Sequence, residues 1–105
     1  MIRQLIETSL LLAQKKMRNI GFSDEQIEQL LTTGRRDLEN EFEHLRRLVE
    51  DGGDEEALNR SLHALKGLLL NMGNESLASK FIELRANEDI EQKRNYLRQM
   101  LFDSK

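Results

Sequence analysis

The sequence has no cysteine and no proline, and only 5% of its 105 residues are aromatic. The absence of cysteine excludes disulfides, thiolate zinc sites and thiol nucleophiles. The longest apolar run, residues 10–13, is far shorter than the roughly 20 residues that span a bilayer. No secretory signal pattern is visible. We therefore expect a cytoplasmic protein with no membrane partner.

The charge of the chain is balanced rather than strongly of one sign. Charged residues make up 33% of the sequence, and the formal net charge is −3. The basic clusters, at residues 15–18 and 35–36, are short enough to be ordinary solvated helix faces, so we expect no nucleic-acid partner. Leu, Glu, Arg, Gln and Lys dominate, and these residues favour helix. The sequence predicts one all-α domain.

Apolar residues at three- and four-residue spacing predict a series of amphipathic helices. The first helix should end before Gly21. Ser23 and Gln26 form a capping box for a short second helix, which should reach about Thr33 before Gly34 breaks or bends the chain. A third helix should cover residues 38–49 and end at the turn of residues 51–54.

Three further helices are expected in the rest of the chain. The fourth should run from about Glu55 to Met72, where Gly73 stops it, and Asn74 should cap the fifth. Asn87 should cap the last helix. Short links predict an up-and-down antiparallel four-helix bundle over residues 34–105, with residues 1–33 as one or two additional N-terminal helices packing on it.

The fourth helix has two different faces. One face is an apolar stripe wide enough to face the core by itself. It consists of Leu58, Leu62, Leu65, Leu68, Leu69 and Met72. A second strip points away from this stripe and contains Asn59, Arg60, His63, Lys66, Gly67 and Leu70. We call this second set the outward strip.

The residue types in the outward strip suit phosphoryl chemistry on His63. A neutral imidazole is a competent nucleophile near pH 7. Lys66, one turn away, can offset the charge of roughly −2 on a phosphoryl group. A glycine within a helix lowers the stability of the helix by about 1 kcal/mol relative to alanine. Gly67 faces outward, so the space left by its missing side chain would serve a binding partner and not the core. Leu70, Asn59 and Arg60 would belong to a docking surface.

Residues 63–85, HALKGLLLNMGNESLASKFIELR, resemble the motif of histidine phosphotransfer (HPt) domains. That motif runs His-x-Leu-Lys-Gly, with a glycine and a leucine ten and fourteen residues after the histidine, positions held here by Gly73 and Leu77. Helix order extends the resemblance over residues 34–102. It implies that His63 exchanges a phosphoryl group with the aspartate of a response-regulator receiver domain, or takes one from a sensor histidine kinase. Mg²⁺ would belong to the receiver, and this chain would bind no cofactor.

The sequence departs from this family at three positions. Small residues are usual where this chain has Leu69 and Leu70, and Leu70 would crowd an approaching receiver. Glu or Gln is usual at the position of Arg85, where it accepts a hydrogen bond from the histidine Nδ1–H. Arg85 has donors only. Either another group orients His63, or Arg85 contacts the phosphoryl group directly.

Other functions find less support in the sequence. Glu41 and His44 form one Glu-x-x-His pair, but a di-iron bundle needs two, so we predict no metal site and a surface position for His44. No glycine-rich loop follows a strand, so the chain should not be an ATP-dependent enzyme. Two alternatives remain: a helical adaptor that docks a partner without phosphoryl transfer, and a phosphoacceptor for a chemotaxis-type kinase acting in trans.

Overall fold

The computed structural model describes residues 2–102 of the chain and consists of helices joined by short turns. The helices are α1 (Ile2–Ile20), α2 (Asp24–Glu50), α3 (Glu55–Asn71), α4 (Glu75–Ala86) and α5 (Ile90–Phe102). No strand occurs among the described residues. The prediction of an all-α fold is therefore confirmed. Over the same range, no helix combines the length and the apolar character needed to cross a membrane.

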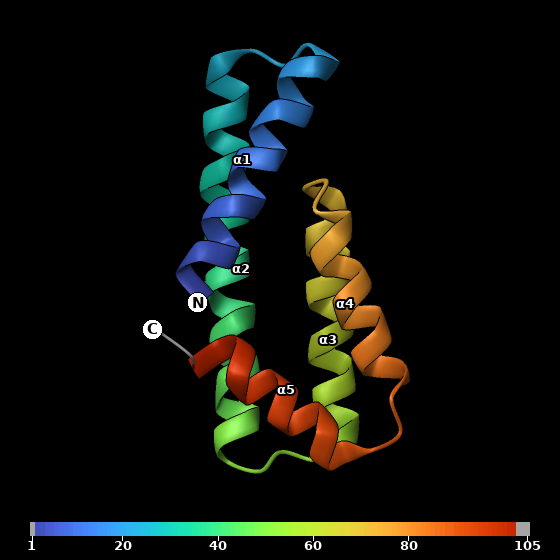
Figure 1. The fold of residues 1–105 in the computed structure, drawn as a ribbon. Coiled ribbons are helices and arrows are strands. Elements are labelled where there is room, and N and C mark those ends of the chain that lie inside the picture. Colours follow the sequence, from blue (N-terminus) through green and yellow to red (C-terminus); the bar gives the residue numbers. More distant parts are fainter. Residues whose placement is uncertain (1, 103–105) are drawn as a thin grey trace.

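The five helices form two hairpins and a crossing helix (Figure 1). Helices α1 and α2 make a long antiparallel hairpin whose turn end extends beyond the other helices. Helices α3 and α4 make the second, shorter hairpin, and α3 also packs on α2. Helix α5 crosses α2 obliquely near the α2–α3 turn and also contacts α1. Helix α4 thus lies beside α3, which bears the outward strip.

One hydrophobic core joins all five helices. Its buried members on α2 and α3 are Leu38, Phe42, Leu45, Val49, Leu58, Leu62, Leu65 and Leu69. The rings of Phe42 on α2 and Phe81 on α4 lie 6.2 Å apart, within the range of favourable aromatic contacts. Every predicted stripe residue of α3 is buried except Leu68, which is partly buried. This stripe fixes the rotation of α3 and turns the outward strip away from the core.

Several predicted helix ends are confirmed. Gly21 has φ 102° and follows the last residue of α1, while Gly73 has φ 84° just beyond the end of α3. These are left-handed conformations, which glycine adopts without a Cβ penalty. Ser23 and Gln26 form the reciprocal capping box at the start of α2. Asn74 accepts a hydrogen bond from the Leu77 N–H and begins α4.

The predicted break at Gly34 is wrong, because α2 continues through it from Asp24 to Glu50. The predicted second and third helices are one, and the boundary drawn between residues 33 and 34 falls inside it. Gly34 serves close packing instead: a Cβ there would lie 2.6 Å from Cε of Met72 at the end of α3. A glycine in a helix lowers its stability, but tertiary packing can override that preference.

The prediction that Asn87 caps the last helix is also wrong. The Asp89 side chain accepts hydrogen bonds from the N–H groups of Glu91 and Gln92, so Asp89 caps α5. Asn87 ends α4 and accepts a hydrogen bond from the Asp89 N–H. Asn87 and Asp89 are both good capping residues and lie two positions apart. The pattern of apolar residues does not show which of them begins the last helix.

Candidate functional site

The outward strip of α3 lies on the surface of the molecule. His63 and Arg60 are exposed, and Asn59, Lys66 and Gly67 are half-buried. Leu70 retains 42% of its accessible surface although it is apolar. The structure therefore places all six residues on the side of α3 that the periodicity predicts. It also leaves the imidazole within reach of a partner.

Gly67 fills no packing role among residues 2–102. A Cβ built on it would meet no other heavy atom within 4 Å, apart from its own helix backbone and chain neighbours. Its φ lies outside the left-handed region, so the backbone does not require glycine either. Alanine would therefore fit here and would stabilise the helix. Among the described residues, neither close packing nor backbone conformation offsets the loss of helix stability that glycine causes at this position.

Arg85 on α4 contacts the imidazole of His63 on α3. Its Nη1 lies 3.2 Å from Nδ1 of His63. An arginine side chain has only donors and keeps its protons in proteins. A hydrogen bond between the two atoms therefore makes Nδ1 the acceptor and places the proton of the neutral ring on Nε2. This tautomer is the opposite of the one that a carboxylate or amide oxygen at the position of Arg85 would select.

One hollow opens beside His63 and a second adjoins it, and Arg85 lines both. The first is lined by Glu55, Glu56, Asn59, Arg60, His63 and Arg85. The second is lined by Asn59, Lys66, Ile82, Arg85 and Ala86. Arg60 and Arg85 share the first hollow with His63 and with the carboxylates of Glu55 and Glu56, and Lys66 lines the second hollow. The guanidinium groups of Arg60 and Arg85 match the geometry of a phosphoryl group.

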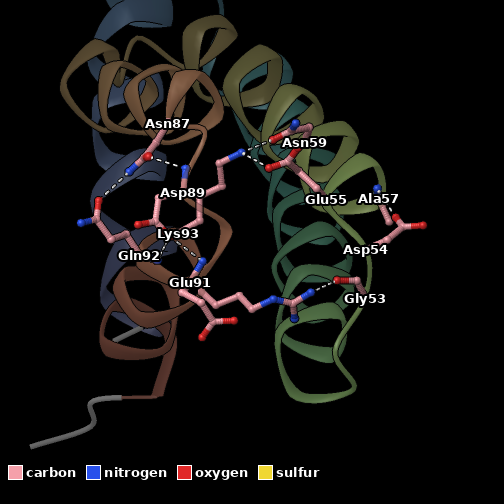
Figure 2. A network of polar contacts seen from close by, with 11 residues as sticks. Gly53, Asp54, Glu55, Ala57, Asn59, Asn87, Asp89, Glu91, Gln92 and Lys93 are labelled. Atoms are coloured by element: carbon pink, nitrogen blue, oxygen red, sulfur yellow. Dashed lines mark hydrogen bonds and ion pairs between the residues drawn. The ribbon is translucent and has the colours of Figure 1, made fainter.

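Asn59 has a structural contact in addition to its place in the first hollow. Lys93 on α5 is only 1% exposed, and its Nζ donates a hydrogen bond to Oδ1 of Asn59 over 3.0 Å. The same Nζ lies 3.6 Å from Oε2 of Glu55 (Figure 2). Asn59 therefore joins α3 to α5, one turn before His63. Its assignment as a docking residue remains a prediction.

Ile82 is a site residue that the sequence analysis missed. It is 47% exposed on α4, three positions before Arg85, and it lines the second hollow. The signal was present, because Ile82 lies outside the buried stripe of α4, which consists of Leu77, Ala78, Phe81 and Leu84. An apolar residue off its stripe is the same anomaly that identified Leu70. The two residues make the surface around the site partly apolar.

The second histidine, His44, lies away from this site on α2. Its side chain is 58% exposed, and its Nδ1 is 3.7 Å from Oε2 of Glu41. Within residues 2–102, no group of three or more histidine, aspartate or glutamate side chains is placed to hold a metal ion. His44 has the surface position predicted for it.

The chain was compared with protein-family models, curated proteins and solved structures. None of the three comparisons finds a match. The geometry of the site therefore carries the functional interpretation.

Proposed function

We propose that this protein is a histidine-containing phosphocarrier, with His63 as its phosphoacceptor. The single observation that carries the proposal is the position of His63, which is exposed on the face of α3 opposite its core stripe and shares a hollow with Arg60 and Arg85. Under this proposal, α2 to α5 serve as the antiparallel four-helix bundle of an HPt-like domain. The protein works in the cytoplasm as one step of a phosphorelay.

The transfer is a displacement at phosphorus between an aspartyl phosphate of a receiver domain and His63. Once the ring proton has moved from Nε2 to Nδ1, the lone pair of Nε2 attacks phosphorus, and the bond from phosphorus to the aspartyl oxygen breaks. The electron pair of that bond leaves with the carboxylate, and the phosphoryl group becomes bonded to Nε2. The reverse step returns it to a receiver aspartate. Mg²⁺ held by the receiver would neutralise charge on the phosphoryl oxygens.

The side chains around His63 have separate tasks in this proposal. Lys66 and Arg60 supply positive charge near the transferring group. Gly67 lets the receiver approach α3 closely, because it adds no side chain at the contact. Leu70 on α3 and Ile82 on α4 give the receiver exposed apolar side chains to contact. This division explains why a helix with a complete core also carries glycine and leucine on its exposed face.

A transfer assay with receiver domains tests the proposal. Each purified receiver encoded in the same genome is phosphorylated with labelled acetyl phosphate, freed of the donor and mixed with the full chain. At least one receiver should pass its label to the wild-type chain and to His44→Gln, but not to His63→Gln. Equal labelling of the His63→Gln variant would refute His63 as the acceptor.

One observation favours a second candidate function, a helical adaptor that docks a receiver without taking its phosphoryl group. Arg85 donates to Nδ1, and the ring then carries its proton on Nε2, the nitrogen that would have to attack. In an adaptor, His63→Gln would leave partner binding and signalling unchanged, whereas Leu70→Asp would abolish both. A phosphocarrier loses signalling in both variants.

A further inference from the structure

We propose that Arg85 is a positioning residue that controls the tautomer of His63, and that it makes this imidazole slow both to accept and to lose a phosphoryl group. The inference rests on the proposed function, because it concerns the same imidazole. It follows from one contact, the 3.2 Å approach of Arg85 Nη1 to His63 Nδ1.

The contact decides which ring nitrogen is a nucleophile. A neutral imidazole has one N–H and one nitrogen with a free lone pair. While Nδ1 accepts the hydrogen bond from Arg85, its lone pair is engaged and Nε2 carries the proton. Attack from Nε2 requires that Arg85 leave Nδ1 and that the proton move, through solvent, from Nε2 to Nδ1. The resting state is therefore one step away from the reactive state.

The same contact favours the phosphorylated state after transfer. Attack from Nε2 gives a cationic ring with a proton on Nδ1, and loss of that proton to solvent leaves a neutral phosphohistidine. Its Nδ1 lone pair can again accept from Arg85. When the phosphorus–nitrogen bond breaks, Nε2 leaves more readily if Nδ1 is protonated, because the leaving group is then a neutral imidazole. An arginine that occupies Nδ1 therefore slows loss of the group.

A carboxylate or amide oxygen at position 85 would act in the opposite direction. Such an oxygen would accept from Nδ1–H, leave the Nε2 lone pair free and favour a protonated Nδ1. Arg85 thus slows the transfer of the phosphoryl group and lengthens the time for which His63 retains it. We infer that His63 holds its phosphoryl group rather than passing it on at once.

Nitrogen-15 NMR of the full chain tests the tautomer without any partner. Protonated and unprotonated ring nitrogens have well-separated ¹⁵N chemical shifts. The His44→Gln variant lacks the signals of His44, so the remaining imidazole signals belong to His63. In the neutral ring, observed at about pH 8, Nε2 of His63 should carry the proton. Arg85→Glu should move it to Nδ1. Lys80→Glu, the same change of charge elsewhere on the exposed side of α4, should leave it on Nε2.

A proton found mainly on Nδ1 in the wild-type chain would overturn the proposal. So would an Arg85→Glu variant in which the proton stays on Nε2. Circular dichroism of each variant shows whether the helices are intact, and Arg85→Gln provides a milder second variant. Neither result depends on whether a receiver exists.

The kinetic part uses phosphoramidate, a small donor that phosphorylates imidazoles directly. Arg85→Gln should accept the phosphoryl group about fivefold faster than the wild type and lose it about fivefold faster, the effect of one exposed hydrogen bond. Arg60→Gln removes a cation that lines the same hollow without touching Nδ1, so it should not accelerate either step. If Arg85→Gln slows acceptance, Arg85 binds the phosphoryl group instead, and the proposal fails.

These outcomes separate the inference from the proposed function. If the tautomer and the phosphoramidate rates behave as expected but no receiver transfers to His63, the proposed function fails and the control by Arg85 stands. If a receiver does transfer while the proton lies on Nδ1, the proposed function stands and the inference fails.

Discussion

Lys93 on α5 donates a hydrogen bond to Asn59 on α3 from a position where its side chain is almost completely buried. The contact joins the last helix to the helix that bears His63 (Figure 2). A buried ammonium group is costly unless it is paired, so its partners determine whether the contact stabilises the fold.

We expect Asn59→Ala to lower the free energy of unfolding by about 2 kcal/mol, because it leaves the ammonium of Lys93 inside the protein with only Glu55, 3.6 Å away, as partner. Lys93→Met, which removes the charge and keeps the volume, should cost less than about 1 kcal/mol. Urea denaturation of both variants measures the difference. A greater loss in Lys93→Met would show that the ion pair itself is strongly stabilising.

Gly67→Ala should raise the free energy of unfolding by about 1 kcal/mol, because alanine is the better helix former and the added methyl group meets open space. The same variant should slow transfer from a receiver, since the methyl group lies on the surface that the receiver must approach. Thermal or urea unfolding and the transfer assay measure the two effects.

Gly34→Ala is the matched control for that substitution. It makes the same gain in helix propensity, but its methyl group would displace the end of the Met72 side chain, so the net gain should be smaller. It lies outside the outward strip and should not affect transfer. Equal transfer rates in Gly67→Ala and Gly34→Ala would contradict a clearance role for Gly67.

Leu70→Asp should leave stability within about 0.5 kcal/mol of the wild type, because the side chain is already exposed. It should abolish transfer from a receiver while phosphoramidate still labels His63 at an unchanged rate. Leu30→Asp, on α2 and of similar exposure at 45%, is the control and should retain both activities. Receiver transfer that survives Leu70→Asp would remove Leu70 from the docking surface.

Ser61 on α3 is buried, and its hydroxyl has no hydrogen-bond partner among the described residues. Burying an unpaired hydroxyl costs free energy, and alanine also forms helix better than serine. Ser61→Ala should therefore raise the free energy of unfolding by about 1 kcal/mol. Urea denaturation that shows a loss of that size would mean that the hydroxyl has a partner in solution.

The helix ends and the two faces of α3 could be predicted from the sequence, because they depend on local chemistry. Gly21 and Gly73 stop helices where a left-handed residue is needed, and Ser23 satisfies N–H groups within its own turn. The outward position of His63 follows in the same way from the spacing of the leucines around it. These features need no knowledge of how the helices pack.

Features that depend on packing could not be predicted. Gly34 reads as a helix break until Met72 is known to lie against it. Lys93 reads as a solvated charge until α5 is placed beside Asn59. The contact of Arg85 with Nδ1 of His63 likewise requires the relative placement of α3 and α4. The sequence indicated that Arg85 was unusual for an HPt-like motif, but not which ring nitrogen it contacts.

The most direct test of His63 as a phosphocarrier is transfer from the phosphorylated chain to a receiver. The full chain is labelled on His63 with phosphoramidate, purified, and mixed with each receiver in the presence of Mg²⁺. We predict that at least one receiver removes the label far faster than buffer does and gains it on its aspartate, while a receiver without that aspartate does not. If the phosphohistidine decays at the buffer rate with every receiver, His63 is not a relay residue.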